Sequence, residues 1–478
     1  MSMVARIARE EWRLWLRSKV VVVAALIVAI LLAVTSVLTM NRISSEQSQR
    51  LEQQVAAEQT FFAQPDRHPH RMVHYGHYAF RTPPPLAMFE PGVDSVTGQS
   101  IFLEGHHQNT AMFADIKASA DLGGFATLTP ANLYQLLLPL LLIVLGHAMF
   151  LRERESGTLA VILAQGQSGV TLALGKALAL FAVITIFMMP LIAVALFSIG
   201  LGESALAAFS MVAGYSAYLC VWGALSLLAS ILIKQRAVSL GVLVFVWLFA
   251  TLIVPRFAIN TSSALIDAPG KIESDLVMLS EQRKLGDGHN AADQAFQTLQ
   301  AEVLEQYEVE TIEELPINWR GVVASSSEAE LTDLMNSFAE KRMGLEASQS
   351  QMFNLFGFAS PMIAISSLSR TIAGTDLATH HRFLRESEVL RFGFVQALND
   401  VHIKQLDYAA DINRNNDAES SQRARVNSDA WKVLDEFRFA PDSAGERLSR
   451  AALPLGILIA WLIAICSIVI FVARKVRL

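Results

Sequence analysis

Cysteine is nearly absent from this sequence, and its scarcity excludes several kinds of protein. Only Cys220 and Cys466 occur among 478 residues, and both lie in apolar runs. Such a chain can build neither a disulfide framework nor a cysteine-rich zinc site. Charged residues are also scarce, at 17% against about 25% in ordinary soluble domains. The net charge of −6 argues against a nucleic-acid-binding protein, which usually carries a basic domain.

Catalytic motifs are lacking as well. The segment from Gly169 to Lys176 comes nearest to a nucleotide-binding P-loop, but it has one residue too many and is followed by Ala177 instead of Ser or Thr. Neither H-E-x-x-H nor G-x-S-x-G occurs. No apolar run has an acidic residue at its centre, which argues against an ion-coupled carrier. We therefore expect no catalytic residues and no cofactor of its own in this chain.

Apolar sequence is what the chain has in abundance, at 53% of the residues. A helix that crosses a membrane needs about 20 mostly apolar residues. Six runs satisfy this length, and they cover residues 20–40, 133–151, 177–199, 205–233, 237–254 and 451–472. Six such runs argue against the buried core helices of a soluble protein. The first run is long for a signal peptide and no clean cleavage site follows it, so we count it as a retained span.

Lysine and arginine in the flanks of the runs predict how the chain is oriented. Basic residues precede the first run, follow the second, separate the fourth from the fifth and follow the sixth; Arg17, Arg152, Lys234 and Arg474 are examples. With six spans all these ends lie on one side, and basic flanks favour the cytoplasmic side. We therefore predict a multi-pass protein of the bacterial inner membrane with both termini in the cytoplasm.

This topology divides the chain into cytoplasmic, membrane and periplasmic segments. They are a cytoplasmic amphipathic helix (1–19), the first span (20–40), a periplasmic insert (41–131), the second span (132–151), a cytoplasmic coupling loop (152–176), three further spans (177–254), a second periplasmic insert (255–450), the sixth span (451–472) and a cytoplasmic tail (473–478). The predicted fold class is an all-α polytopic membrane protein, with a mostly helical extracytoplasmic domain built from the two inserts.

The inserts differ in their local patterns. The second insert has apolar residues at helical spacing, and Ser325 with Glu328 has the spacing of a capping box at a helix start. The first insert has six prolines between residues 65 and 91, which favours loops. Because both inserts emerge from one bundle, we expect them to pack together. Residues 361–368 are apolar but too few to span, and two interpretations stay open: an interfacial element, or core of the outer domain.

The loop after the second span carries a recognisable pattern. A charged start is followed by a short apolar stretch, a polar turn at 165–168, and a Gly-Lys pair that opens the third span. This arrangement resembles the ABC-2-type permeases, the membrane subunits of one class of ABC transporter. The residues that carry the resemblance are Glu153, Glu155, Gly157, Thr158, Leu159, Gly175 and Lys176. Many members have Ser-Pro in the turn, where this chain has Gln-Gly-Gln-Ser. The large inserts, with residues 103–109 and 374–383, resemble a subgroup related to the nitrous-oxide-reductase maturation permease.

The resemblance implies partners and a function. Such a permease has no ATPase site, so ATP and Mg²⁺ would bind to a cytosolic ABC ATPase dimer made of separate chains. A coupling helix at about residues 153–165 would carry the motion of that dimer into the bundle, with Glu153, Glu155, Gly157, Thr158, Leu159 and Lys176 as the ATPase-coupling residues. A second permease subunit, identical or related, would complete the complex. ATP hydrolysis would drive export, or mechanical work on a periplasmic cargo or partner protein.

Histidine is distributed unevenly along the chain. Six of the 11 histidines fall in the first insert, at His68, His70, His74, His77, His106 and His107. Imidazole suits zinc, copper and nickel, so one interpretation is a periplasmic metal site at these residues. The other is a polar surface of hydrogen-bonding histidines, because their spacing matches no known closed metal site. The sequence leaves both interpretations open.

A second class of function also fits the outer domain. A non-transporting receptor or scaffold would bind a ligand there and use the bundle only as an anchor in the lipid membrane. A simple anchor does not need six spans or a coupling-type loop, so we favour the permease. Association with a cytosolic ATPase distinguishes the two hypotheses.

Overall fold

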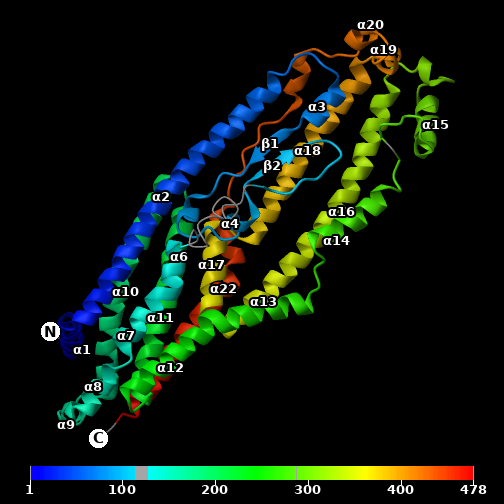
Figure 1. Cartoon of the computed structure of the whole chain (residues 1–478). Helices are drawn as coiled ribbons and strands as arrows, with labels where there is room; N and C mark the ends of the chain where they lie inside the picture. Colours follow the sequence, from blue (N-terminus) through cyan, green and yellow to red (C-terminus); the bar gives the residue numbers. More distant parts are fainter. Residues whose placement is uncertain (1, 113–127, 287, 477–478) are drawn as a thin grey trace.

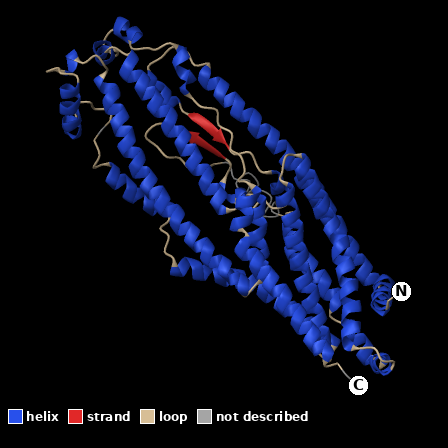
Figure 2. Ribbon diagram, turned by 180° about the vertical axis from the view of Figure 1, so that it is seen from behind, coloured by secondary structure: helices blue, strands red, loops and turns tan. Residues whose placement is uncertain are grey.

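The structure is a computed structural model that describes residues 2–112, 128–286 and 288–476. Helices form one elongated molecule, and both ends of the chain lie at the same end of it (Figures 1 and 2). The strands within the described residues are β1 (His77–Phe80) and β2 (Ser100–Leu103), which pair antiparallel. The prediction of an all-α architecture is therefore confirmed, apart from this one hairpin in the first insert. Part of that insert, residues 113–127, and the last two residues of the predicted tail lie outside the described residues.

Six helices within the described residues are long and apolar enough to cross a membrane. They are α2 (Lys19–Phe62), the run of α6 (Pro130–Asn132), η4 (Leu133–Leu137), α7 (Leu138–Gly146) and α8 (Met149–Glu155), then α10 (Gly169–Gly200), α11 (Ala205–Leu232), the run of α12 (Arg236–Leu248), η5 (Phe249–Ile253) and α13 (Val254–Leu265), and finally α22 (Ala452–Arg474). Each overlaps one of the six predicted spans, although α2 continues to Phe62 and α10 begins at Gly169, inside the predicted loop. The helix α1 (Met3–Arg17) precedes them and ends where Ser18 caps α2.

The longest helix, α2, joins the first span to the first insert without a break. At about 1.5 Å per residue its 44 residues extend over about 66 Å. Its first half exposes a row of large apolar side chains, including Val23, Leu26, Ile27 and Ile30. Continuous exposed apolar surface of this kind is typical of a membrane or partner interface.

The centre of the bundle is α11, which packs against α7, α10, α22 and α17 (Pro361–Ala373). Its residues Tyr215, Tyr218 and Trp222 are fully buried, and the Tyr218 hydroxyl donates to the Gln135 carbonyl oxygen at 2.7 Å. Nearby, Pro190 interrupts the hydrogen-bond ladder of α10. The Tyr134 hydroxyl bridges this turn, because it donates to the Phe187 carbonyl and accepts from the Leu191 N–H.

Most of the remaining helices form a second body at the end away from the termini, here called the distal body (residues 44–112, 266–360 and 374–450). Its principal helices are α16 (Trp319–Leu355) and α18 (Leu377–Gln405), and its smaller elements are α3 (Pro69–Tyr75), η1 (Pro85–Met88), α4 (Asp94–Thr97), α14 (Lys271–Gln282), η6 (Gln294–Phe296), α15 (Gln297–Gln306), η7 (Ile312–Glu314), η8 (Phe356–Phe358), α19 (Tyr408–Asn413), α20 (Ala418–Arg423), η9 (Ser428–Val433) and α21 (Ala444–Arg450). Phe61, Met72, Leu103, Phe394 and Trp431 share one apolar core there. The two inserts therefore pack together.

One local expectation for the second insert was wrong, and one of two interpretations left open there is excluded. Ser325 and Glu328 do not start a helix: α16 begins at Trp319, with the Asn318 side chain as its cap, and Glu328 lies inside it, fully buried. Residues 361–368 are not part of the distal core. As part of α17 they pack on α11 and α22, with Ile365 and Leu368 in the core of the bundle. In both places long-range packing overrides the local pattern.

Candidate functional site

The predicted coupling loop lies at the tip of the bundle, at the same end as both termini (Figure 1). A continuous helix over 153–165 was expected, but the structure has two: α8 ends at Glu155 and α9 (Thr158–Ala164) follows. The break occurs at Gly157, whose φ of 75° is left-handed and therefore favours glycine. The Thr158 hydroxyl lies 2.8 Å from the Ser156 hydroxyl and fixes this turn. Leu159 is buried and Leu163 is partly buried against the bundle core, whereas Val161 is exposed, so α9 is anchored on one side and open on the other.

Behind this loop, a buried cluster of charges joins three helices. The Lys176 ammonium on α10 donates to Glu11 of α1 at 2.5 Å and to Glu153 of α8 at 2.6 Å. Arg152 also pairs with Glu11. Lys176 is completely buried, so among the predicted coupling residues it holds the scaffold together and cannot contact a docked protein. Glu11 was missed by the sequence analysis, although its spacing from Ala8 and Trp15 places it on the buried face of α1.

Two further contacts tie the coupling loop to the next pair of helices. Glu155 pairs with Arg236, the first residue of α12, at 2.5 Å. Arg154 donates to the carbonyl oxygens of Ile231 and Ile233 at the end of α11. The loop is therefore connected to α1, α10, α11 and α12, which lets a displacement of α9 reach most of the bundle.

The histidines of the first insert divide among separate places in the distal body. His70 and His74 lie one turn apart on α3, and their Nε2 atoms are 3.2 Å apart. His106, after β2, and His289, between α14 and η6, complete a four-histidine cluster. One ligand atom from each ring lies within 4.8 Å of those of the other three. His289 was missed, because nothing in the sequence connects it to residues nearly two hundred positions earlier.

The other three predicted histidines lie outside this cluster. His68 and His402 each place Nε2 within 3.0 Å of the Asp411 carboxylate, which the Arg414 guanidinium also contacts. Both imidazoles and the Arg414 guanidinium are hydrogen-bonded to that carboxylate, so this group is a buried hydrogen-bond network. His77 is buried beside the Gln54 amide, and His107 is exposed.

The four-histidine cluster has a buried polar support. The His106 Nδ1 lies 2.8 Å from the Glu328 carboxylate, which also accepts the backbone N–H of His106 at 3.1 Å. Arg391 of α18 holds the other oxygen of Glu328 at 2.5 Å. Burial alone would raise the pKa of the Glu328 carboxyl, but the hydrogen bond from His106 and the charge of Arg391 together lower it. The carboxylate therefore stays ionised and fixes His106 with Nδ1 as the donor.

Burial lowers the pKa values of two histidines in the cluster. Burial and then the neighbouring imidazoles lower the pKa of His70 to about 2, and the same causes lower the pKa of His74. Both rings are therefore neutral near pH 7, which is the form that binds metals.

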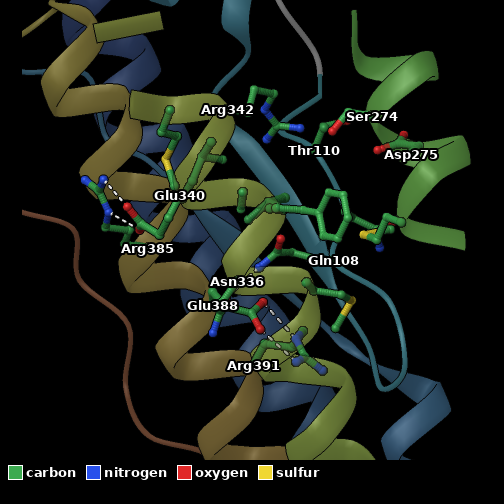
Figure 3. Close-up of a pocket in the computed structure, with 18 of the residues that line it drawn as sticks. Gln108, Thr110, Ser274, Asp275, Asn336, Glu340, Arg342, Arg385, Glu388 and Arg391 are labelled. Atoms are coloured by element: carbon green, nitrogen blue, oxygen red, sulfur yellow. Dashed lines mark hydrogen bonds and ion pairs between the residues drawn. The ribbon is translucent and has the colours of Figure 1, made fainter. Parts of the chain in front are cut away.

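A pocket of mixed polarity lies next to this support, between α14, α16, α18 and the segment after β2 (Figure 3). Two ion pairs border it, Glu340–Arg385 at 2.6 Å and Glu388–Arg391 at 2.7 Å. Gln108 and Asn336 are hydrogen-bonded to each other across one wall. Arg391 is thus shared between the pocket and the carboxylate that supports His106.

A family described as a domain of unknown function (DUF3526) matches residues 275–440, which lie mainly in the distal body and include His289, Glu328 and Arg391. No curated protein and no solved structure matches the chain. The matched region leaves out all six membrane-length helices and the coupling loop.

Proposed function

We propose that this chain is the membrane subunit of an ABC-2-type transporter. In this proposal a separate cytosolic ABC ATPase dimer hydrolyses ATP, and the chain converts that energy into export or into mechanical work on a periplasmic cargo or partner. The observation that carries the proposal is α9, a short helix at the end that holds both termini, with Val161 exposed on it and Leu159 as its buried anchor.

The contacts around α9 supply a route for the motion. A push on α9 acts through Glu153 on the Lys176 cluster and so on α1 and α10. It also acts through the Glu155–Arg236 pair on α12. The run of α12, η5 and α13 continues as one helix to Leu265, and α13 packs against α16 of the distal body. Closure of the ATPase dimer would therefore reach the distal body through this run of helix.

The long helices suit a protein that works across a bilayer. We infer that the bundle lies in the bacterial inner membrane, with both termini in the cytoplasm and the distal body in the periplasm. The exposed apolar side chains of α2, α10 and α22 would contact lipid or a second permease subunit, identical or related to this chain.

Copurification of an ATPase with this chain is the decisive test. We expect the tagged full-length protein, purified in mild detergent from its native host, to bring down a stoichiometric soluble protein with a P-loop. Val161→Glu places a charge on the exposed face of α9 and should abolish this association, whereas Val389→Glu, at an exposed apolar position of the distal body, should preserve it. Mass spectrometry of the purified complexes reads out both variants.

The opposite outcome favours the receptor or scaffold hypothesis. A monodisperse preparation without any P-loop protein would remove the basis of the transporter proposal. The mixed pocket in the distal body, bordered by Glu340–Arg385 and Glu388–Arg391, would then be the candidate ligand site (Figure 3).

A further inference from the structure

The four-histidine cluster of the distal body is far from α9 and has no part in the proposed coupling. We propose that His70, His74, His106 and His289 bind one divalent transition-metal ion of the zinc class, and that the ion joins the two inserts. The site requires neither ATP nor an ATPase partner, so its test is independent of the proposed function.

The spacing of the four rings fits a single ion. Their centroids are between 4.7 and 6.0 Å apart in all six pairs. In a tetrahedral zinc site with Zn–N bonds of about 2.0–2.1 Å, neighbouring nitrogens lie about 3.3 Å apart. The Nε2 atoms of His70 and His74 are already at 3.2 Å. Small rotations of the His106 and His289 rings would bring their nitrogens to the same separation, because all four ligand atoms start within 4.8 Å of one another.

His106 has the outer-sphere partner that a metal-binding histidine requires. Its Nδ1 donates to Glu328, which leaves the Nε2 lone pair as the ligand atom. This Nε2 is buried and has no hydrogen-bond partner among the described residues. A buried polar atom without a partner is costly, and a bound cation would remove that cost.

The backbone conformation of His106 also helps to orient its ring toward the other three histidines. Its φ of 66° is left-handed, which is uncommon for a residue with a side chain. Glu328 stabilises this conformation by accepting the His106 N–H as well as the ring Nδ1–H. Because Arg391 in turn holds Glu328, the orientation of the ring is set by α16 and α18 and not by the turn alone.

The donor set selects the class of ion. Four imidazoles suit zinc, copper or nickel, whereas magnesium and calcium require oxygen ligands. His74 and His289 are exposed, so the ion can enter directly from solvent. The ligands come from α3, from the turn after β2 and from the loop before α15, so the ion would cross-link chain segments that are distant in sequence.

The test uses full-length protein in detergent, stripped with a chelator and then titrated with Zn²⁺ alone by isothermal calorimetry. We expect one Zn²⁺ per chain, together with a zinc-dependent rise in Tm. Both His74→Ala and His289→Ala should abolish high-affinity binding, and because these side chains are exposed the variants should fold without the metal. Extended X-ray absorption at the zinc edge should report four nitrogens at about 2.0–2.1 Å.

Two controls separate a built site from surface binding. His107→Ala removes an exposed histidine next to the cluster and should bind Zn²⁺ as the parent does. Glu328→Gln keeps the size of the outer-sphere group and should weaken binding about 10- to 100-fold. Equal Zn²⁺ affinity in the parent, His74→Ala and His289→Ala, or no binding in a folded parent protein, would overturn the proposal.

Discussion

At the residue scale, Gly157 illustrates how a motif position can be required for its backbone alone. Its φ is 75°, yet no atom lies within 4 Å of where a Cβ would be placed. Crowding therefore does not select glycine here; the left-handed conformation does. Gly175 is the opposite case, because a Cβ there would lie 2.6 Å from the Ile7 side chain of α1. The two glycines of the permease-like pattern thus have different physical reasons.

This difference yields a matched pair of variants at Gly157. Asparagine tolerates the left-handed region, so Gly157→Asn should retain ATPase stimulation close to the parent level. Proline fixes φ near −65°, so Gly157→Pro should misplace the start of α9 and reduce stimulation at least tenfold. Neither should lower the amount of folded protein. The rate of ATP hydrolysis by the reconstituted complex is the measurement, and normal coupling in Gly157→Pro would count against a docking role for α9.

At the scale of elements, α1 is held to the bundle by one close approach and one charge cluster. Gly175 allows α1 to lie against α10, and Lys176 neutralises Glu11 where both are buried. Buried ion pairs are costly to form but far more costly to break on one side. The pair therefore specifies where α1 docks, which explains in physical terms why glycine and lysine stand together in the pattern.

Removing the lysine alone should release α1. Lys176→Met leaves Glu11 buried with Arg152 as its remaining cation, so we expect a loss of about 3–5 kcal/mol and faster proteolysis within Met3–Arg17. Adding Glu11→Gln removes the uncompensated charge and should recover part of the lost Tm. Lys234→Met, at an exposed position, is the control and should leave Tm unchanged. Identical Tm values for the Lys176 and Lys234 variants would contradict the buried-pair account.

At the scale of the whole molecule, two long helices connect the bundle to the distal body. One is α2, which ends with Phe61 in the distal core. The other is the run of α12, η5 and α13, where the π-helical turn η5 accommodates Pro255 and the Ser360 hydroxyl donates to the Ala250 carbonyl at 2.6 Å. Because α2 is helical across this boundary and α13 packs against α16, both elements help to position the distal body.

The proposed orientation of the chain in the membrane can be tested by cysteine labelling in a Cys220→Ala/Cys466→Ala background. Gln165→Cys lies beside α9, and Glu419→Cys lies on α20 of the distal body; both positions are exposed. A membrane-impermeant maleimide added to intact cells should label Glu419→Cys alone, and lysis should make Gln165→Cys reactive. Labelling of Gln165→Cys in intact cells would invert the proposed topology.

The sequence by itself determined that the chain is mostly helical and that six of its apolar runs are long enough to cross a membrane. Runs such as 205–233 and 451–472 could be recognised because apolar length is a local property, and a helix satisfies its own backbone hydrogen bonds. Even the polar continuation of the first run as one helix to Phe62 follows from local preference. The pattern after the second run predicts a coupling loop there, although the break at Gly157 depends on a backbone conformation that composition does not reveal.

Only the tertiary structure decided which distant residues meet. His289 joins His70, His74 and His106 because α14 and α3 belong to one packed body, and no spacing along the chain encodes that distance. Glu328 has the local pattern of a helix cap, yet packing between α16 and α18 makes it the buried partner of Arg391 and His106. Helix formation rests on neighbours in sequence, whereas a site made of side chains from several elements rests on how those elements pack.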